Sequence, residues 1–356
     1  MRASSLLLNR ADVPEGSTPG LAALLRGGFA VPLGPGLMGG GSLAERSLAR
    51  IEAQLLRRLP LPCVCLAASD GDALVNLALQ LGAADAAGGS GAGPNGAVCL
   101  GAGFRHEPAA SRGLLELSLY RRLDAVLVGR ERELLFDPAE VLLDALAQWG
   151  LDDLQRHEQP GPDGGQELSW STPAPDAEQG GAPIELLRRL SRPVQGDVCA
   201  LLVSMDLHAL LAALSERRCD ARGLSWPAGL APFDVALLSL VPGGRDTLEK
   251  LLPELRAAGL EVLLDDRPGP APAARAELLA WGLPALVMAG PRSGAGAHAG
   301  SQSGGELLLE LRHGEAPLRV AVADVVRQLN AGLGRSSASS SGSSSGSRTR
   351  RRALLW

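Results

Sequence analysis

Aromatic residues are scarce in this sequence, and their scarcity limits how its core can be built. Phe, Trp and Tyr together make up 3% of 356 residues, with a single Tyr. Because 46% of the chain is hydrophobic, the interior must come mainly from Leu, Val and Ala. Charged residues make up 21% and the net charge is -5, a composition typical of folded globular proteins. The length allows two domains of ordinary size.

Long apolar runs and regularly spaced cysteines are also absent. No apolar run reaches the roughly 18 to 20 residues of a transmembrane helix, so we expect no membrane partner. The five cysteines are odd in number and scattered, and only Cys63 and Cys65 are close in sequence. A structural zinc site takes about four ligands. We therefore expect buried free thiols in a reducing compartment, no metal and no cofactor.

Both ends of the chain have biased compositions. The first ten residues, MRASSLLLNR, contain no acidic residue, which is typical of an organelle presequence and favours the mitochondrial matrix. From Ser336 the chain continues with SSASSSGSSSGSRTRRRALLW, in which Ser and Gly cannot build a core. Its positive charge predicts contact with RNA phosphates or an acidic protein surface. The arginines of this tail are Arg348, Arg350, Arg351 and Arg352.

Two segments of the first half have clear helical patterns. SLAERSLARIEAQLLRRL predicts a helix from Ser42, with Ser42 and Glu45 as a capping box. Its inward face is predicted at helical spacing by Leu48, Ile51 and Leu55.

FDPAEVLLDALAQWG predicts a second helix, capped by Asp137 and stopped by Gly150. Short buried strands are predicted over 97–101 and 124–129.

From about residue 232 the apolar runs alternate regularly between strand and helix patterns. Strands are predicted over 233–240, 260–266, 284–290 and 305–312, and helices over 246–259, 275–282 and 322–333. This alternation predicts a compact α/β domain with a mixed, largely parallel five-stranded sheet.

Three phrases of this second half resemble prolyl-tRNA synthetases, a family of class II aminoacyl-tRNA synthetases. They are DARGLSWPAGLAPFDVALL, LRAAGLEVLLDDR and WGLPALVMAG. Upstream, FRHEPAASRGLL is similar to motif 2 of the same family. The resemblance implies an α/β protein with a degenerate antiparallel α+β catalytic-like core over 1–219. An anticodon-binding-like domain over 220–333 and a basic tail over 334–356 would follow.

Within the motif 2 resemblance, Arg105 and Glu107 match the family's ATP-binding Arg and acidic residue. The match fails further along, where GLLELSLY replaces Gly-Leu-Leu-Arg-x-Arg-Glu-Phe and Glu116 reverses a charge. Arg105 and Glu107 are therefore interpreted as remnants. They either form an ion pair that ties the hairpin together or retain some nucleotide binding.

Motif 3 and the amino-acid pocket also depart from the family pattern. Val203 and Met205 replace flexible glycines, and His208 replaces the Arg that braces the triphosphate. A mostly neutral imidazole cannot replace a guanidinium on phosphate. Where the family has Thr-x-Glu, this chain has Ser69 and Gly71. We therefore expect no catalytic residue and a protein that is not an enzyme.

These observations predict an inactive synthetase-like protein that contacts RNA and protein subunits in a larger assembly, first the mitochondrial ribosome. The RNA would be rRNA or tRNA, and within the anticodon-like domain Arg267 and Arg275 are the candidate phosphate contacts. Two alternatives stay open: an accessory, processivity subunit of an organellar DNA polymerase, and a divergent tRNA synthetase or trans-editing factor.

Overall fold

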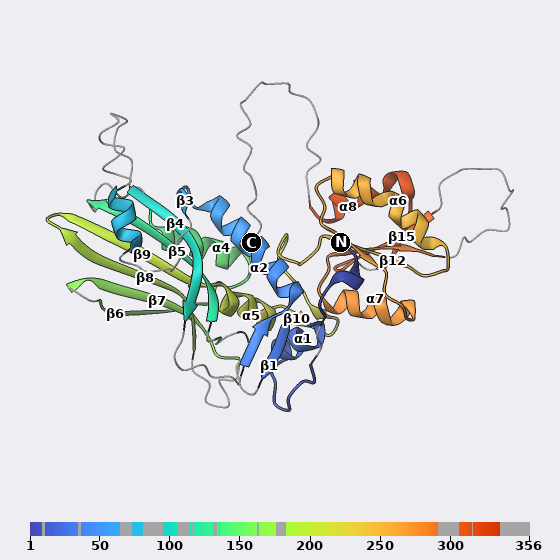
Figure 1. The fold of residues 1–356 in the computed structure, drawn as a ribbon, viewed down its shortest axis with the longest axis horizontal. Helices are drawn as coiled ribbons and strands as arrows, with labels where there is room; N and C mark the ends of the chain where they lie inside the picture. The colour runs from blue at the N-terminus through green and yellow to red at the C-terminus, as the bar shows by residue number, and fades with distance from the viewer. Residues whose placement is uncertain are drawn as a thin grey trace, which may run out of the picture.

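The computed structural model contains two sheet-based modules side by side (Figure 1). The structure describes the chain in the ranges 1–8, 11–34, 37–64, 73–80, 95–104, 114, 117, 119–130, 134, 136–161, 164–175, 183–290, 306–314 and 316–334. The expected antiparallel α+β core followed by an α/β domain is confirmed.

The N-terminal module is built on a seven-stranded sheet in the order β3-β4-β5-β9-β8-β7-β6. All neighbouring strands are antiparallel except β3 and β4. The strands are β3 (Cys63–Val64), β4 (Asn95–Phe104), β5 (Leu119–Arg130), β6 (Gln155–Pro160), β7 (Gln166–Thr172), β8 (Ile184–Gln195) and β9 (Val198–Asp206).

Four helices form a shared core with one face of this sheet. They are α1 (Pro19–Gly27), α2 (Ser42–Arg58), α4 (Pro138–Gln148) and α5 (Leu207–Arg217). On α2 the predicted inward residues Leu48, Ile51 and Leu55 are fully buried. On the opposite sheet face, a helical segment over 73–80 packs its own small cluster against the strands.

The predicted caps had different outcomes. Asp137 caps α4 as expected, with its carboxylate accepting from Ala139 N at 2.9 Å. The predicted Ser42 cap is wrong, because α2 has Gly41 as its N-cap residue and no side-chain cap. Gly41 N donates to the Phe29 carbonyl at 2.7 Å, and a Cβ there would lie 2.1 Å from the Gly28 oxygen.

Two hairpins lie outside the large sheets. The first pairs β1 (Ala30–Gly34) with β2 (Leu37–Gly40). The second pairs β10 (Cys219–Asp220) with β11 (Gly223–Leu224) and leads into the C-terminal module. The expected domain boundary between 219 and 220 therefore falls inside the second hairpin.

The C-terminal module has a five-stranded sheet in the order β13-β12-β14-β15-β16. Its strands are β12 (Val235–Ser239), β13 (Val262–Asp265), β14 (Ala285–Ala289), β15 (Glu306–Leu311) and β16 (Leu318–Ala321). The first three are parallel to one another, whereas β15 and β16 pair antiparallel, so the sheet is mixed. Strand β16 was not predicted.

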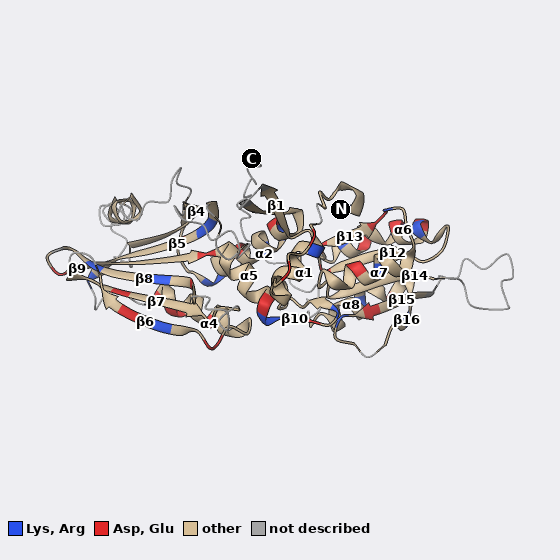
Figure 2. Cartoon of the chain, turned by 90° about the horizontal axis from the view of Figure 1, so that it is seen from below, with Lys and Arg blue, Asp and Glu red and all other residues tan. Residues whose placement is uncertain are grey.

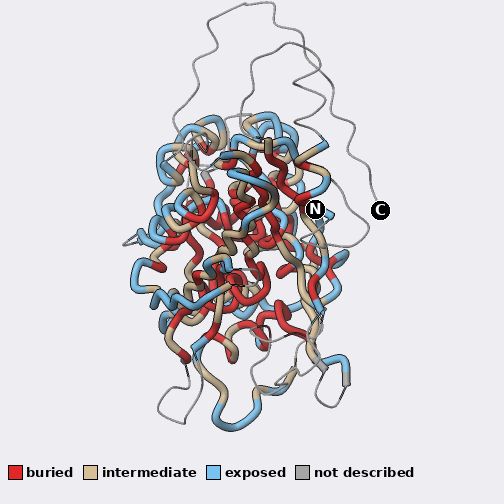
Figure 3. The backbone as a smooth tube through the Cα atoms, turned by 90° about the vertical axis from the view of Figure 1, so that its left-hand side faces the viewer, coloured by how far each residue is buried: buried red, intermediate tan, exposed pale blue. Residues whose placement is uncertain are grey.

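The two faces of this sheet pack into different hydrophobic cores. Helices α6 (Gly244–Ala257) and α8 (Val325–Gly332) close a core that belongs to this module alone. Helix α7 (Ala271–Ala280) covers the other face, whose core is continuous with that of the N-terminal module. Figure 3 shows the buried segments in the interior, with exposed turns around them.

Residues of the two modules meet directly in this continuous core. The rings of Phe29 and Trp226 have centroids 5.4 Å apart, and Trp226 Nε1 donates to the Trp281 carbonyl at 2.9 Å. Trp281, which follows α7, is fully buried. The modules therefore share an apolar interface.

The first residues of the chain are part of the C-terminal fold. The Met1 amine donates to the Val262 carbonyl and Leu264 N donates to the Met1 carbonyl, each at 2.9 Å, along β13. Asp266 accepts from Ser4 N at 2.7 Å and from Ser4 Oγ at 2.6 Å. A short 3₁₀ helix, η1 (Ala3–Ser5), follows this pairing.

Candidate functional site

The segments that resemble motifs 2 and 3 meet at the centre of the N-terminal sheet. Strands β4 and β5 form the arms of the motif 2 hairpin, and β9 lies against β5 before entering α5. Arg105, Glu107 and Glu116 lie outside the described residues, as do Ser69 and Gly71. The expected ion pair of Arg105 with Glu107 therefore stays a prediction.

His208 lies at the start of α5 in a buried, electrically neutral state. Its side chain is 7% exposed, and its Nδ1 accepts from Arg121 N at 2.9 Å. Burial, with a smaller contribution from the positive charge of Arg121, lowers the pKa of His208 to about 4. The Asp206 carboxylate caps the helix by accepting from His208 N at 2.8 Å. His208 thus supplies an acceptor to the backbone of β5 and no positive charge near neutral pH.

The two side chains at the family's glycine positions are structural. Val203 is fully buried and Met205 is 1% exposed, and both belong to the core between the sheet and its helices. Apolar burial of this kind stabilises the β9–α5 junction. It replaces the backbone flexibility that glycines would give.

A polar group that was not predicted lies on the face of β5 and β9 opposite to Val203 and Met205. Asp124 is 3% exposed and accepts from Arg122 Nε at 2.8 Å and from Ser204 Oγ at 2.6 Å. Burial raises the pKa of Asp124 although Arg122 opposes the shift. Tyr120 packs so closely over Gly103 that a Cβ there would lie 2.3 Å from its ring. The alternating polar residues of YRRLD were the available sequence signal.

Beside His208, Arg121 joins β5 to α2. Its Nη2 lies 2.7 Å from Glu45 Oε2, and its Nη1 lies 3.0 Å from Glu52 Oε1. Burial raises the pKa of Glu52, and the attraction of Arg121 acts in the other direction. Glu45, expected in a capping box, therefore pairs across the module instead.

The two arginines of the C-terminal module that were predicted to contact phosphate are both hydrogen-bonded to carboxylates. Arg267 Nη2 donates to Asp265 Oδ2 at 2.7 Å, and its Nη1 donates to Glu277 at 2.9 Å. Hydrogen bonding to Asp265 is the largest cause that raises the pKa of Arg267. Arg275 binds Glu310 through two bonds of 2.7 and 2.8 Å. RNA binding by these arginines stays a prediction, and it would require exchange of these partners.

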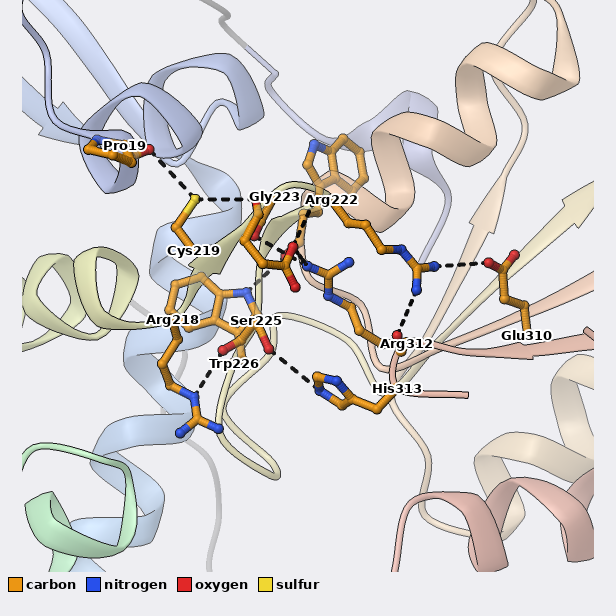
Figure 4. Close-up of polar contacts among 12 residues, drawn as sticks. Pro19, Arg218, Cys219, Arg222, Gly223, Ser225, Trp226, Glu310, Arg312 and His313 are labelled. Carbon is orange, nitrogen blue, oxygen red and sulfur yellow. Dashed lines mark hydrogen bonds and ion pairs between the residues drawn. The ribbon is translucent and has the colours of Figure 1, made fainter. Parts of the chain in front are cut away.

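Sequence reasoning also missed an arginine network between the modules (Figure 4). Arg312, 3% exposed, donates to Asp220 Oδ1 at 2.7 Å and to the Gly223 carbonyl at 3.2 Å. Arg222 donates to the Arg312 carbonyl at 2.8 Å and to Glu310 at 3.0 Å. These contacts join the β10–β11 hairpin to β15. Arg348, Arg350, Arg351 and Arg352 lie outside the described residues.

Neither a one-sided charge distribution (Figure 2) nor a metal-binding cluster marks the described part of the chain. In the view of Figure 2, basic and acidic residues are interspersed along the chain rather than gathered on one face. Among the described residues, no group of three or more His, Cys, Asp or Glu side chains could hold a metal ion. Within the same ranges, no helix has the length and hydropathy of a membrane span. Cys99 is buried and forms no disulfide, whereas Cys63 is exposed.

Relatives with known names match part of the chain. It is 49% identical over 89 residues to "Proline--tRNA ligase" of Methylobacterium nodulans and 37% identical over 123 residues to that of Shouchella clausii. The protein of the same name in Ralstonia pickettii is 36% identical over 134 residues. These matches cover 23%, 34% and 36% of this chain but only 19%, 20% and 22% of the relatives, about a fifth of their length. No protein-family model matches the chain.

A solved structure matches over both modules. The crystal structure of prolyl-tRNA synthetase from Cryptosporidium parvum, complexed with halofuginone and AMPPNP, superposes with a TM-score of 0.64. The match covers 88% of this chain and 77% of that chain at 9% identity, so it shows a common fold.

The relatives correct one expectation from the sequence. The chain was expected not to be an enzyme, but its relatives are named as ligases and therefore point to an enzyme. That expectation rested on substitutions at single motif positions. Such substitutions change local charge and packing, and they do not by themselves decide whether a protein is catalytic.

Proposed function

Because the chain is similar to prolyl-tRNA synthetases in sequence and in fold, we propose that it contacts RNA as a subunit of a larger assembly. The mitochondrial ribosome, in the matrix, is the first candidate assembly. The partners would be RNA, either rRNA or tRNA, and neighbouring protein subunits.

The continuous core between the modules carries this proposal. The rings of Phe29 and Trp226 are in contact at an interplanar angle of 36°, and Trp281 is fully buried. Buried apolar contact between domains fixes their relative position, whereas small polar interfaces permit domain motion. A synthetase-like module and an anticodon-domain-like module would then present one rigid surface to structured RNA. Double-stranded RNA is recognised mostly by its shape, and a fixed surface suits this kind of recognition.

A second candidate function is proline–tRNA ligation, which the names of the relatives favour. The matches cover about a fifth of the relatives, at 19% and 20%. The ligase activity of those proteins therefore comes to this chain only as a proposal. The two candidates differ in their stable partners and in their chemistry.

The test is purification of the tagged full-length chain from its own cells, followed by gradient sedimentation, mass spectrometry and RNA sequencing. Under the first proposal the protein co-sediments with ribosomal proteins and rRNA, and mild RNase treatment releases it. A protein that sediments alone with tRNA and catalyses proline-dependent ATP–pyrophosphate exchange would contradict the first proposal and support the second.

A further inference from the structure

A large cavity lies between α2 and the C-terminal module. Its volume is about 860 Å³, within the range of about 300 to 1,000 Å³ that is usual for small-molecule sites. One wall is α2, another is the loop over 226–231, and the remaining walls come from the turn after β15 and the end of α8. The two modules therefore build this cavity together.

One face of α2 supplies polar groups to the cavity. Arg50, Gln54 and Arg57 are four and three residues apart, so they lie on the same side of the helix. Arg50 pairs with Asp234 at 2.8 Å, and Gln54 Nε2 donates to the Ala228 carbonyl at 3.2 Å. Arg57 is exposed, and no acidic side chain of the described ranges pairs with it.

A third arginine that lines the cavity, Arg218, directly follows α5. Arg218 donates through Nε to the Ser225 carbonyl at 3.2 Å and through Nη1 to the Trp149 carbonyl at 3.3 Å. Both acceptors are main-chain carbonyls, so neither neutralises its charge. Figure 4 shows Arg218 and His313 approaching Ser225 from different elements, and His313 Nε2 lies 3.5 Å from Ser225 Oγ.

The charges lining the cavity do not balance. Among the described residues that line it, the acidic side chains are Asp234 and Glu261. Asp234 is neutralised by Arg50, and Glu261 by Arg46, which lies 2.6 Å away. Within the part of the chain that the structure describes, no carboxylate pairs with the guanidinium groups of Arg57 and Arg218, which leaves a surplus of two positive charges.

We propose that this cavity binds a small organic phosphate monoester of nucleotide size, with Arg57 and Arg218 supplying the positive charge. A phosphate monoester carries about 1.5 to 2 negative charges near neutral pH, which matches this surplus better than a single carboxylate. Guanidinium groups bind phosphate oxygens with favourable planar geometry. The side chains of Trp226, Leu311 and Leu333 line the same cavity and offer apolar contact to an organic body. The proposal does not depend on RNA binding or on ligase activity.

Calorimetric titration of the full-length protein tests this site with AMP as the probe. Adenosine lacks the phosphate and inorganic phosphate lacks the organic body, so both serve as ligand controls. We expect AMP to bind at least tenfold more tightly than either. Because Arg57 is exposed and has no ion-pair partner among the described residues, Arg57→Gln should leave the fold intact and weaken AMP binding about tenfold, equivalent to about 1.4 kcal/mol.

The matched control is Arg256→Gln, which removes the same charge from an exposed arginine that does not line the cavity. It should leave AMP binding within twofold. Equal AMP affinity in the Arg57→Gln protein and the unmodified protein would overturn the assignment. So would equal binding of AMP and inorganic phosphate. A 5′-phosphorylated RNA oligonucleotide could instead bind more tightly than AMP, in a way that depends on Arg57. The ligand would then be the 5′ end of an RNA, and the proposal of a small ligand would be overturned.

Discussion

Burial shifts the protonation equilibria of individual side chains around β5 and β9. His208 lies in α5 directly after β9 and Asp124 lies in the neighbouring β5, yet burial shifts their pKa values in opposite directions. Burial disfavours the charged form of each group, and this form is the cation for His and the anion for Asp. Burial therefore opposes the ionisation of both groups, and the cation of Arg122 acts against this effect at Asp124.

We predict that His208 makes the fold acid-sensitive. Its folded pKa of about 4 is below its usual value of 6.5, so the unfolded chain binds the proton more tightly. Stability should fall as the pH decreases from about 6.5 to about 4, by up to about 1.4 kcal/mol per pH unit. Urea unfolding at several pH values should show a shallower acid loss in His208→Gln. Identical pH profiles for the two proteins would contradict this account.

Among the elements, α1 and α5 show how close packing depends on specific residues. Glu216 of α5 accepts from Gly20 N and Leu21 N at 2.9 Å each, and from the Thr18 hydroxyl. Its carboxylate therefore caps the first turn of α1, where the helix dipole favours negative charge. A Cβ at Gly20 would lie 2.5 Å from Glu216 Cδ, so only glycine permits this approach.

We expect Glu216→Gln to lower the free energy of unfolding by about 1 to 2 kcal/mol, the usual range for loss of a charged cap. The measurement is chemical denaturation at neutral pH. Glu254→Gln is a matched control, because Glu254 is an exposed helical residue with no side-chain partner in the described ranges. Equal losses in the two variants would show that charge number, rather than capping, is responsible.

In the whole molecule, the stability of the C-terminal module depends on the N-terminal module, because the two share a continuous core. One face of its sheet is closed by α6 and α8 within the module. The other face buries Leu278, Trp281 and Met288 in the core shared with the N-terminal module. Separation of the modules would therefore expose apolar surface.

A fragment of residues 220–333 should still unfold cooperatively, because the α6–α8 core is internal to it. Its melting temperature should be lower than that of the full chain by about 10 °C or more, since loss of apolar burial costs several kcal/mol. Differential scanning calorimetry of both proteins provides the comparison. A fragment without a cooperative transition would mean that 220–333 is not an autonomous domain.

The arginine-rich tail is predicted to contact RNA phosphates. Deleting residues 336–356 removes four arginines and should reduce the salt slope of RNA binding by about 3, at roughly 0.7 to 0.9 per phosphate contact. Binding of single-stranded RNA would be measured over a series of salt concentrations. Replacing only Arg348, Arg350, Arg351 and Arg352 by Gln separates charge from length. An unchanged slope in both variants would show that the tail contacts no phosphate.

The sequence alone determined features that depend on neighbouring residues. The inward spacing of Leu48, Ile51 and Leu55 and the cap at Asp137 were both readable, as was the strand–helix alternation after residue 232. Each arises from side chains within one or two turns or along one strand. The resemblance to synthetases was readable because it rests on contiguous phrases.

Only the tertiary structure decided the features that join distant segments. The N-cap residue of α2 is Gly41 and not the predicted Ser42, because the backbone at residues 28 and 29 approaches Gly41 closely. His208 is neutral because it is buried beside Arg121, 87 residues away in sequence. The charge surplus of the interdomain cavity likewise depends on which distant carboxylates reach which arginines. Local pattern cannot reveal such pairings, because burial and charge balance are set by contacts that form only when the chain has folded.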